Sequence, residues 1–558
     1  MGCNKASNRI WANGTEAAIR PNKPDRLRAE FVFYSGIGTP FDKIAALIAD
    51  VMNKFHSLVV LMDAILRIVL AQASAHAVTP LQTGSPSNAS EATSTPMLGD
   101  IAGPPVADHR ATSLEWTDVP GILTRIHAPE FPERNFDVIT YGAKGDGVTD
   151  SLPAIRTAME KCHASGGGHV VVPAGTYLLN GPVYLQSNVD LHLQRGCTLL
   201  FSGKPEHYLP VVLTRWEGTI LYNYSPLIYA RDEENIAVTG DGVIDGDARL
   251  VFRGWAMGAT KLQDKAQIQS REMNAKGTPI AERKFGEGSF LRPSMIQPYE
   301  CRNVLIQGVT VKDSPFWVVH PTFCTNVIVR RVTVDSLTIN NDGCDPDSCT
   351  DVLIEDCYFH TGDDGIAIKA GRDQDAWRDG RMTENVIIRH CRFQSKINGL
   401  CIGSEMAAGV RHVFMEDCRV EEGASCIYFK SNRDRGGFIE NARVRRIQVD
   451  ISKAAVIRFE TNYQGYRGGK SPTTYRDFVI EDINADEASA YMLFAEGLDE
   501  LPIRGVLLRN VIVKYAREPL FLRNVDGIRL DNVRVNGTTL PEFPAMTPSD
   551  APRLKISI

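Results

Sequence analysis

The sequence has few features of a metal protein or a nucleic-acid binder. Its 12 cysteines form no CxxC pair and no Cys/His spacing typical of a metal site, so we predict no metal and no cofactor. The 61 Lys and Arg residues are outnumbered by 67 Asp and Glu residues, which gives a formal net charge of −6. This balance argues against a general surface for nucleic acid or other polyanions. An anionic substrate would have to meet a local basic cluster.

Long apolar runs are also scarce, with one exception near the N-terminus. Residues 52–77 have a basic start, a mainly apolar middle and a small-residue end, which is the order of a secretory signal peptide. Asp63 and Arg67 interrupt the apolar part, so an amphipathic helix without a special role is the alternative. We predict that translation starts at or near Met52, that residues 1–51 are not part of the functional protein, and that the product is secreted or periplasmic. No other run is long enough to span a membrane.

Composition divides the rest of the chain. Residues 78–112 are rich in Pro, Ser, Thr, Gly and Ala and are typical of a flexible linker. One folded domain is expected over residues 116–540, followed by a tail at 541–558. Near its start, the pattern predicts an amphipathic helix over residues 150–162 with Asp150 as N-cap. Such a helix would cover the first coil of a solenoid and block its open edge.

From Pro182 onward, short strand-like runs recur at intervals of about 25–35 residues. Most of them start with Asn or Asp followed by a Val-x-Ile pattern. The repeat predicts an all-β solenoid, in which polar entry residues hydrogen-bond along the stack while Val and Ile fill the core. The runs start at Val189, Asn235, Asn303, Asn326, Asp351, Asn385, His412, Asn441, Phe478, Val506 and Gly527.

Several cysteines fall at similar places in these runs. Cys301, Cys324, Cys357, Cys391 and Cys418 each lie within or beside a strand-like segment. We interpret them as small buried hydrophobes stacked in the solenoid core, with disulfides as the alternative.

The segment from residue 340 to residue 369 carries two acidic clusters. They are Asp342 with Asp345 and Asp347, and Asp363 with Asp364. Between them, the alternating run from Asp351 to Phe359 predicts one strand with one buried face. Asp363 follows Asp342 by 21 residues, about one coil, so the clusters would meet on adjacent rungs. Paired carboxylates suit general acid/base work, above all glycoside cleavage, although Asp is also common in structural turns.

At these residues the sequence resembles the polygalacturonase family of glycoside hydrolases, family 28. Asn340-Asn341-Asp342 is similar to the family's Asn-x-Asp motif, and Gly362-Asp363-Asp364 to its Asp-Asp motif. The resemblance implies a right-handed parallel β-helix and a pectic polysaccharide or oligosaccharide substrate. It also implies Asp363 as the general acid, Asp342 with Asp364 as the pair that activates water, and inversion at the anomeric carbon.

Two family motifs are altered. The His of the usual Gly-His-Gly motif is missing, and Ile397 or Asn398 takes its place. In the Arg-x-Lys motif, Tyr428 takes the Arg position while Lys430 remains. These departures leave the exact pectic substrate open.

Seven candidate substrate-binding residues surround the aspartates. A Lys/Arg cluster could hold a uronate carboxylate, with a solvated charged turn as the alternative for its two arginines. The candidates are Lys430, Arg433 and Arg435 in that cluster, with Asn340, Asn398, His320 and Arg372. For His320 a structural role is the more common one, and for Trp317 a core position is favoured over a sugar-stacking platform. The helical pattern over residues 251–287 predicts a wall or lid beside the cleft.

Two other functions remain open from the residues alone. A β-helical polysaccharide lyase would use Ca²⁺ and an Arg or Lys base, and would lose activity with a chelator. A non-catalytic polysaccharide-binding or tailspike-like protein would explain the missing His.

Overall fold

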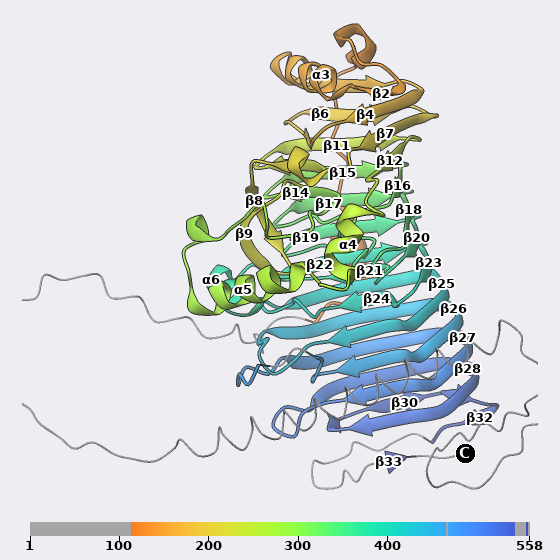
Figure 1. The fold of residues 1–558 in the computed structure, drawn as a ribbon. Coiled ribbons are helices and arrows are strands. Elements are labelled where there is room, and N and C mark those ends of the chain that lie inside the picture. Colours follow the sequence, from red (N-terminus) through yellow and green to blue (C-terminus); the bar gives the residue numbers. More distant parts are fainter. Residues whose placement is uncertain (1–112, 465–466, 542–553, 556–558) are drawn as a thin grey trace, which may run out of the picture. The chain divides into compact units, whose positions relative to one another are not determined.

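The computed structural model describes residues 113–464, 467–541 and 554–555, which form a stack of parallel strands (Figure 1). Four predicted segments lie wholly or mostly outside these residues: the segment 1–51, the signal peptide at 52–77, the linker at 78–112 and the tail at 541–558. In the described part, no helix is both long and apolar enough to cross a membrane.

The coils of the stack line up in three faces, on which strands of neighbouring coils pair in parallel. On the third face, some neighbouring coils are joined only by isolated bridges. The first face holds β1 (Asn135–Asp137), β3 (Gly168–Val172), β6 (Val189–Leu193), β11 (Glu234–Gly240), β15 (Arg302–Gln307), β17 (Thr325–Arg330), β19 (Thr350–Glu355) and β22 (Thr383–Arg389). The second holds β2 (Asp146–Asp150), β4 (Gly175–Leu179), β7 (Cys197–Phe201), β12 (Val243–Asp245), β16 (Thr310–Lys312), β18 (Thr333–Ser336), β20 (Tyr358–Thr361) and β23 (Arg392–Ser395). The third holds β5 (Val183–Tyr184), β10 (Ile228–Arg231), β14 (Ile296–Tyr299), β21 (Ile366–Ile368) and β24 (Asn398–Ile402).

Towards the C-terminus the strands become long and run through all three faces. They are β25 (Val410–Lys430), β26 (Phe438–Glu460), β27 (Thr474–Glu496) and β28 (Ile503–Arg523), followed by β29 (Val525–Asp526), β30 (Arg529–Asp531), β31 (Arg534–Val535), β32 (Thr538–Thr539) and β33 (Leu554–Lys555). The architecture is the predicted right-handed parallel β-helix, and every strand-like run that we singled out in the sequence lies in a strand or at its edge.

The polar entry residues form a ladder along the stack, as predicted. Asn235, Asn303, Asn326, Asp351 and Asn385 all have φ between 55° and 59°, a left-handed conformation that Asn and Asp tolerate well. Their side chains bond from coil to coil: Asn303 Nδ2 donates to Asn235 Oδ1 at 2.8 Å, and Asn326 Nδ2 to Asn303 Oδ1 at 2.8 Å. The entry Asn therefore both turns the chain and links neighbouring rungs.

The core between the faces is filled mainly by Val and Ile, with Ala, Leu and Cys among them. The 11 cysteines of the described residues are all buried and free, which confirms the interpretation as stacked hydrophobes rather than disulfides. At the N-terminal end, α3 (Leu152–Ala164) buries Ile155, Ala158 and Met159 against the first coils. The capping helix was predicted correctly, but its N-cap is Ser151; Asp150 Oδ1 accepts a hydrogen bond from Leu152 N at 3.1 Å.

The segment 113–127, which we call the N-terminal strap, crosses the outside of the first face. It holds η1 (Trp116–Asp118) and α2 (Val119–Leu123). Its Val119, Ile122 and Ile126 belong to one apolar cluster with outward-facing residues of successive coils. These are Ala237, Leu305, Ile328, Leu353, Ile387 and Phe414.

The strap explains a wrong prediction for the run from Asp351 to Phe359. Instead of one strand with one buried face, the chain forms β19 and β20, and it bends at Asp356, where φ is 56°. Both faces of β19 are buried, because Leu353 packs under the strap while its neighbours point into the core. Local alternation could not reveal a cover that comes from more than 200 residues earlier.

A block of helices and short strands projects beside the stack (Figure 1). It holds η3 (Pro205–Tyr208), β8 (Val212–Trp216), β9 (Thr219–Asn223), α4 (Val251–Met257), α5 (Gln263–Lys276), η4 (Ile280–Glu282), β13 (Lys284–Phe285) and α6 (Asp373–Asp379). α5 contacts both β9 and α6. The insertion predicted at 251–287 is therefore one part of a larger wall. A further short helix, η2 (Val138–Tyr141), lies near the N-terminus and is separate from this wall.

Candidate active site

The third face brings the two acidic clusters onto neighbouring rungs. The backbone of Cys344 bridges Ile366 in parallel, and Gly343 N donates to Asp364 O at 2.9 Å. This register places Asp342 next to Asp364 in one column, and Asn398 follows on the next rung, where its carbonyl accepts from Gly365 N at 2.7 Å.

Glycine is required beside both clusters. A Cβ on Gly343 would lie 2.3 Å from the ring of Phe359, and one on Gly365 would lie 2.5 Å from the ring of Phe393. Both contacts are much shorter than real carbon contacts. The two glycines therefore let each acidic turn settle directly on the stacked aromatic rings of the core.

Asp342, Asp363 and Asp364 converge on one cavity of about 430 Å³. Each offers one oxygen, and these oxygens lie within 4.8 Å of one another. Such spacing could suit a divalent cation. However, Lys430 Nζ lies 3.0 Å from Asp364 Oδ2, and Lys369 Nζ lies 3.7 Å from Asp342 Oδ2. Because these ammonium groups would repel a cation, we interpret the three carboxyl groups as an acid/base set rather than metal ligands.

Burial and mutual repulsion change the protonation of this set. Burial, reinforced by the charge of Asp364, raises the pKa of Asp363 to about 6. Burial and the charge of Asp363 raise the pKa of Asp342 well above its usual value. The site thus holds an acid that is protonated in mildly acidic solution and has two further carboxyl groups within reach, which suits general acid catalysis.

Asp364 is held on both of its oxygens. Asn398 Nδ2 donates to Oδ1 at 2.6 Å, and Lys430 Nζ donates to Oδ2 at 3.0 Å. Asn398 is one of the two candidates for the position of the family's His, and its side chain is buried against Asp364 rather than exposed in the cavity lining. It therefore orients a carboxylate.

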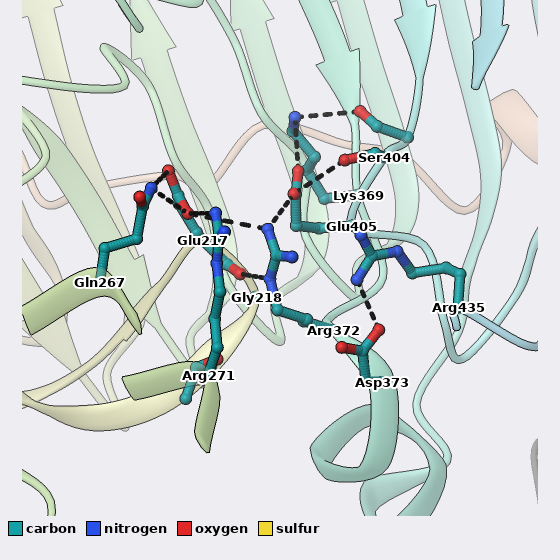
Figure 2. A network of polar contacts seen from close by, with 12 residues as sticks. Glu217, Gly218, Gln267, Arg271, Lys369, Arg372, Asp373, Ser404, Glu405 and Arg435 are labelled. Atoms are coloured by element: carbon teal, nitrogen blue, oxygen red, sulfur yellow. Dashed lines mark hydrogen bonds and ion pairs between the residues drawn. The ribbon is translucent and has the colours of Figure 1, made fainter. Parts of the chain in front are cut away.

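A network of charged residues runs from Lys369, which lies beside Asp342, to the wall (Figure 2). Lys369 Nζ donates to Glu405 Oε2 at 3.2 Å, and Glu405 also pairs with Arg372. Arg372 Nε donates to the carbonyl of Glu217 at 2.8 Å. Arg271 of α5 then pairs with the carboxylate of Glu217 at 2.7 Å. Burial would raise the pKa of Glu405, but Lys369 and Arg372 outweigh it and hold this pKa well below its usual range.

Besides Lys430, three predicted binding residues line the same cavity beside this network. Arg435 is buried and pairs with Asp373 Oδ1 at 2.6 Å. Arg372 lines it as described above. Asn340 also lines the cavity, where its Oδ1 accepts from Arg292 Nη2 at 2.7 Å and its backbone N–H donates to Asp363 Oδ2 at 3.3 Å.

Besides Asn398, the structure places two predicted residues away from the cavity lining. His320 is fully buried between Gln297, at 2.9 Å from Nδ1, and Asp347, at 3.5 Å from Nε2, so it is a structural histidine. Arg433 is partly exposed and its guanidinium lies 3.6 Å from Glu500. Neither contacts the cavity, so direct substrate contact by these two side chains is not supported.

Several cavity residues were missed or undervalued in the sequence. Trp317 is only 3% exposed, as favoured, yet it also borders the cavity, with Lys369 Nζ 4.6 Å from its ring centre. The cavity residues that the sequence did not single out are Glu217, Gln267, Arg271, Lys369, Ser404, Glu405, Tyr463 and Gln464. Lys369 could have been predicted from the sequence. It follows the Asp pair on the third face, and it lies two residues after Ala367, so its side chain points to the same side of the strand.

The fold and the site together define a β-helical glycoside hydrolase. Residues 162–529 match the family model described as "Glycosyl hydrolases family 28", which covers more than half of the chain. The chain belongs to this family, as the Asn-x-Asp and Asp-Asp motifs indicated.

Known proteins of this kind are similar over most of the chain. The crystal structure of a hyperthermoactive exopolygalacturonase from Thermotoga maritima is 37% identical, with a TM-score of 0.73, and the match covers 76% of this chain and 97% of that one. A probable polygalacturonase of Vitis vinifera is 27% identical over 454 residues, 77% of this chain and 84% of the relative. An endo-polygalacturonase of Pectobacterium carotovorum subsp. carotovorum is 26% identical over 379 residues, 66% of this chain and 85% of the relative.

Proposed function

We propose that the protein hydrolyses a pectic galacturonan, or a related chain containing uronate, and releases its products from one chain end. The observation that carries the proposal is the convergence of Asp342, Asp363 and Asp364 on a cavity that is also lined by five basic side chains. These are Arg271, Lys369, Arg372, Lys430 and Arg435.

Charge balance in the cavity favours a negatively charged sugar. Its lining holds five carboxyl groups and five cationic groups. Because Asp363 has a raised pKa of about 6, a protonated Asp363 leaves the lining with a positive net charge below that pH. Guanidinium and ammonium groups that are largely buried bind carboxylates strongly, so a uronate fits better than a neutral sugar.

In the proposed reaction, Asp363 donates its proton to the glycosidic oxygen as the bond to the anomeric carbon breaks. Asp342 and Asp364 hold the attacking water and take up its proton. The oxygens of the three groups lie within 4.8 Å, closer than the roughly 6.5–9.5 Å usual for an inverting pair. Inversion is therefore proposed from the family resemblance, not from this distance. NMR of the first anomer released tests it, and a retained configuration would contradict it.

The wall beside the cavity supports action at a chain end. Glu217 lies in the turn between β8 and β9, Gln267 and Arg271 lie on α5, and Arg372 directly precedes α6. Side chains from three inserted segments thus close in on a groove that a stack of bare coils would leave open along its length. Similarity to the exopolygalacturonase from Thermotoga maritima points the same way.

Digestion of polygalacturonate tests both substrate and mode. We expect reducing ends to accumulate with little loss of viscosity, and one short product to dominate from the first minutes, while Asp363→Asn is inactive. A rapid viscosity loss with mixed oligosaccharides would indicate internal cleavage. Products with a new double bond, together with loss of activity on adding a chelator, would indicate a lyase. A panel of rhamnogalacturonan and decorated oligosaccharides would identify a different pectic substrate.

Secretion is a separate part of the proposal, supported by the pattern of residues 52–77. N-terminal sequencing of exported protein is expected to find a start after this segment. A mature protein that begins before Met52 would contradict it.

A further inference from the structure

Asp345 is a buried carboxyl group for which the proposed reaction gives no role. It follows Cys344 on the third face and is fully buried, three residues from Asp342. Among the described residues, neither of its side-chain oxygens meets a hydrogen-bond donor. Lys369 Nζ lies 4.0 Å from Oδ1, beyond hydrogen-bond distance. Asp342 Oδ1 is likewise buried without a donor.

Asp347, two residues further on, shows that the fold supplies donors where it holds a charged carboxylate. It is equally buried, but it accepts from Arg215 Nη1 at 3.0 Å and from Gly371 N at 2.9 Å, and His320 Nε2 lies 3.5 Å away. Burial would raise the pKa of Asp347, yet Arg215 and His320 hold it below its usual value. The same turn thus gives a set of hydrogen-bond donors to Asp347 and none to Asp345.

A buried carboxylate without partners takes up a proton instead of remaining charged. Burial and the charge of Asp342 raise the pKa of Asp345 well above its usual value, and the two side chains are within hydrogen-bonding reach. The other charged groups that act on Asp345 are Lys369 and Asp364. Two carboxyl groups with unsatisfied oxygens side by side are satisfied when one proton lies between them.

We propose that Asp345 is a positioning residue that stays protonated and donates its O–H to Asp342 Oδ1. Asp342 Oδ2, the oxygen 3.7 Å from Lys369 Nζ, is then left to face the water that attacks the sugar. The inference rests on the proposed function, because it assumes that Asp342 helps to activate water. It adds a fourth carboxyl group that acts through Asp342 and never touches the substrate.

Two variants separate a neutral donor from a charged base. Asp345→Asn keeps a neutral hydrogen-bond donor of the same shape, so kcat should stay within about threefold of the unchanged protein. Asp345→Ala removes the donor, and kcat should fall at least about tenfold while KM stays the same. An Asn variant as impaired as the Ala variant, or an Ala variant with unchanged kcat, would overturn the proposal.

Asp347→Asn is the matched control at equal burial. It should lower the thermal unfolding midpoint because Arg215 loses its charged partner, whereas Asp345→Asn should leave the midpoint unchanged or raise it. A clear drop for Asp345→Asn would show that the Asp345 carboxyl is ionised, and would count against the proposal.

A spectroscopic readout does not depend on catalysis or on a folded Ala variant. The infrared difference between the unchanged protein and Asp345→Asn at neutral pH should show the C=O band of a protonated carboxyl group, and its absence would refute the idea. The Asp342→Asn variant distinguishes failure of the role proposed for Asp342 from failure of the role proposed for Asp345. If this variant keeps full activity, the role proposed for Asp342 fails; if it is inactive while Asp345→Ala is unimpaired, only the role of Asp345 fails.

Discussion

Lys430 and Asp364 form a buried ion pair beneath the cavity, with Nζ 3.0 Å from Oδ2 although 66 residues separate them in sequence. Their side chains are only 9% and 1% exposed. Burial would lower the pKa of Lys430, but Asp364 and neighbouring groups raise it well above its usual value. Lys430 is therefore held as a cation beside this carboxyl group.

Removing this lysine should destabilise the fold. Lys430→Met leaves Asp364 buried without its cation, and we expect a loss of about 3–5 kcal/mol in the free energy of unfolding, measured with urea. Lys514→Met is the control, since Lys514 pairs with Asp486 at 2.8 Å but is 74% exposed. There the loss should be below about 1 kcal/mol. Equal losses in both variants would contradict the role of burial.

Replacing the proposed general acid should remove most of the activity. Asp363→Asn has no acidic proton to donate, so kcat should fall at least about a hundredfold while KM changes little. Asp356→Asn is the control, because Asp356 lies in the preceding turn but is 51% exposed and away from the cavity lining. A rate within threefold of the unchanged protein in Asp363→Asn would remove the assignment.

The pH dependence should follow the same residue. Since the pKa of Asp363 is raised to about 6, this acid is protonated below that pH and loses its proton above it. We expect kcat/KM to fall about tenfold for each pH unit above 6, because the deprotonated form cannot act as an acid. The residual rate of Asp363→Asn should lack this limb. A profile that stays flat to pH 8 would show that another group is the acid.

Arg271 tests the contribution of the wall. Its guanidinium lines the cavity and pairs with Glu217, so Arg271→Met should raise KM for oligogalacturonate about tenfold with a smaller effect on kcat. Lys276→Met removes a positive charge from the same helix at a side chain that is 72% exposed. It should leave KM unchanged. If both variants behave alike, helix α5 does not contact the substrate.

Free cysteines predict indifference to reductant. Because the 11 described cysteines are buried and unpaired, dithiothreitol should not change the thermal unfolding midpoint. A thiol reagent should label them only after denaturation, which also serves as the positive control. A lower midpoint with reductant would reveal a disulfide.

Much of this site could be predicted because it follows the repeat. Asp342 and Asp363 are one coil apart in sequence, so a solenoid brings them together, and Lys430 follows in the same way. The entry Asn ladder is equally regular. In such a fold, spacing along the chain translates directly into distance along the stack.

The remainder depends on contacts that no repeat encodes. Glu217 and Arg271 reach the cavity from insertions with their own local folds, and the pairing of Glu217 with both Arg271 and Arg372 arises only when the wall is packed in place. His320 and Asn398 show the converse case, in which residues predicted to bind substrate have other partners. Both are polar residues near the aspartates in sequence, but their side chains are turned to buried partners, which only the register of neighbouring rungs determines.

The N-terminal strap has a mechanical consequence for the whole stack. A solenoid whose coils touch only their neighbours can fray one coil at a time from an open end. Here one continuous segment clamps six successive coils, from Ala237 to Phe414, through a shared apolar seam, and Arg125 bonds across it to Asp351 at 2.7 Å. A coil beneath the N-terminal strap can unfold only if the strap also detaches from the other coils. The coils that carry the aspartates should therefore unfold together.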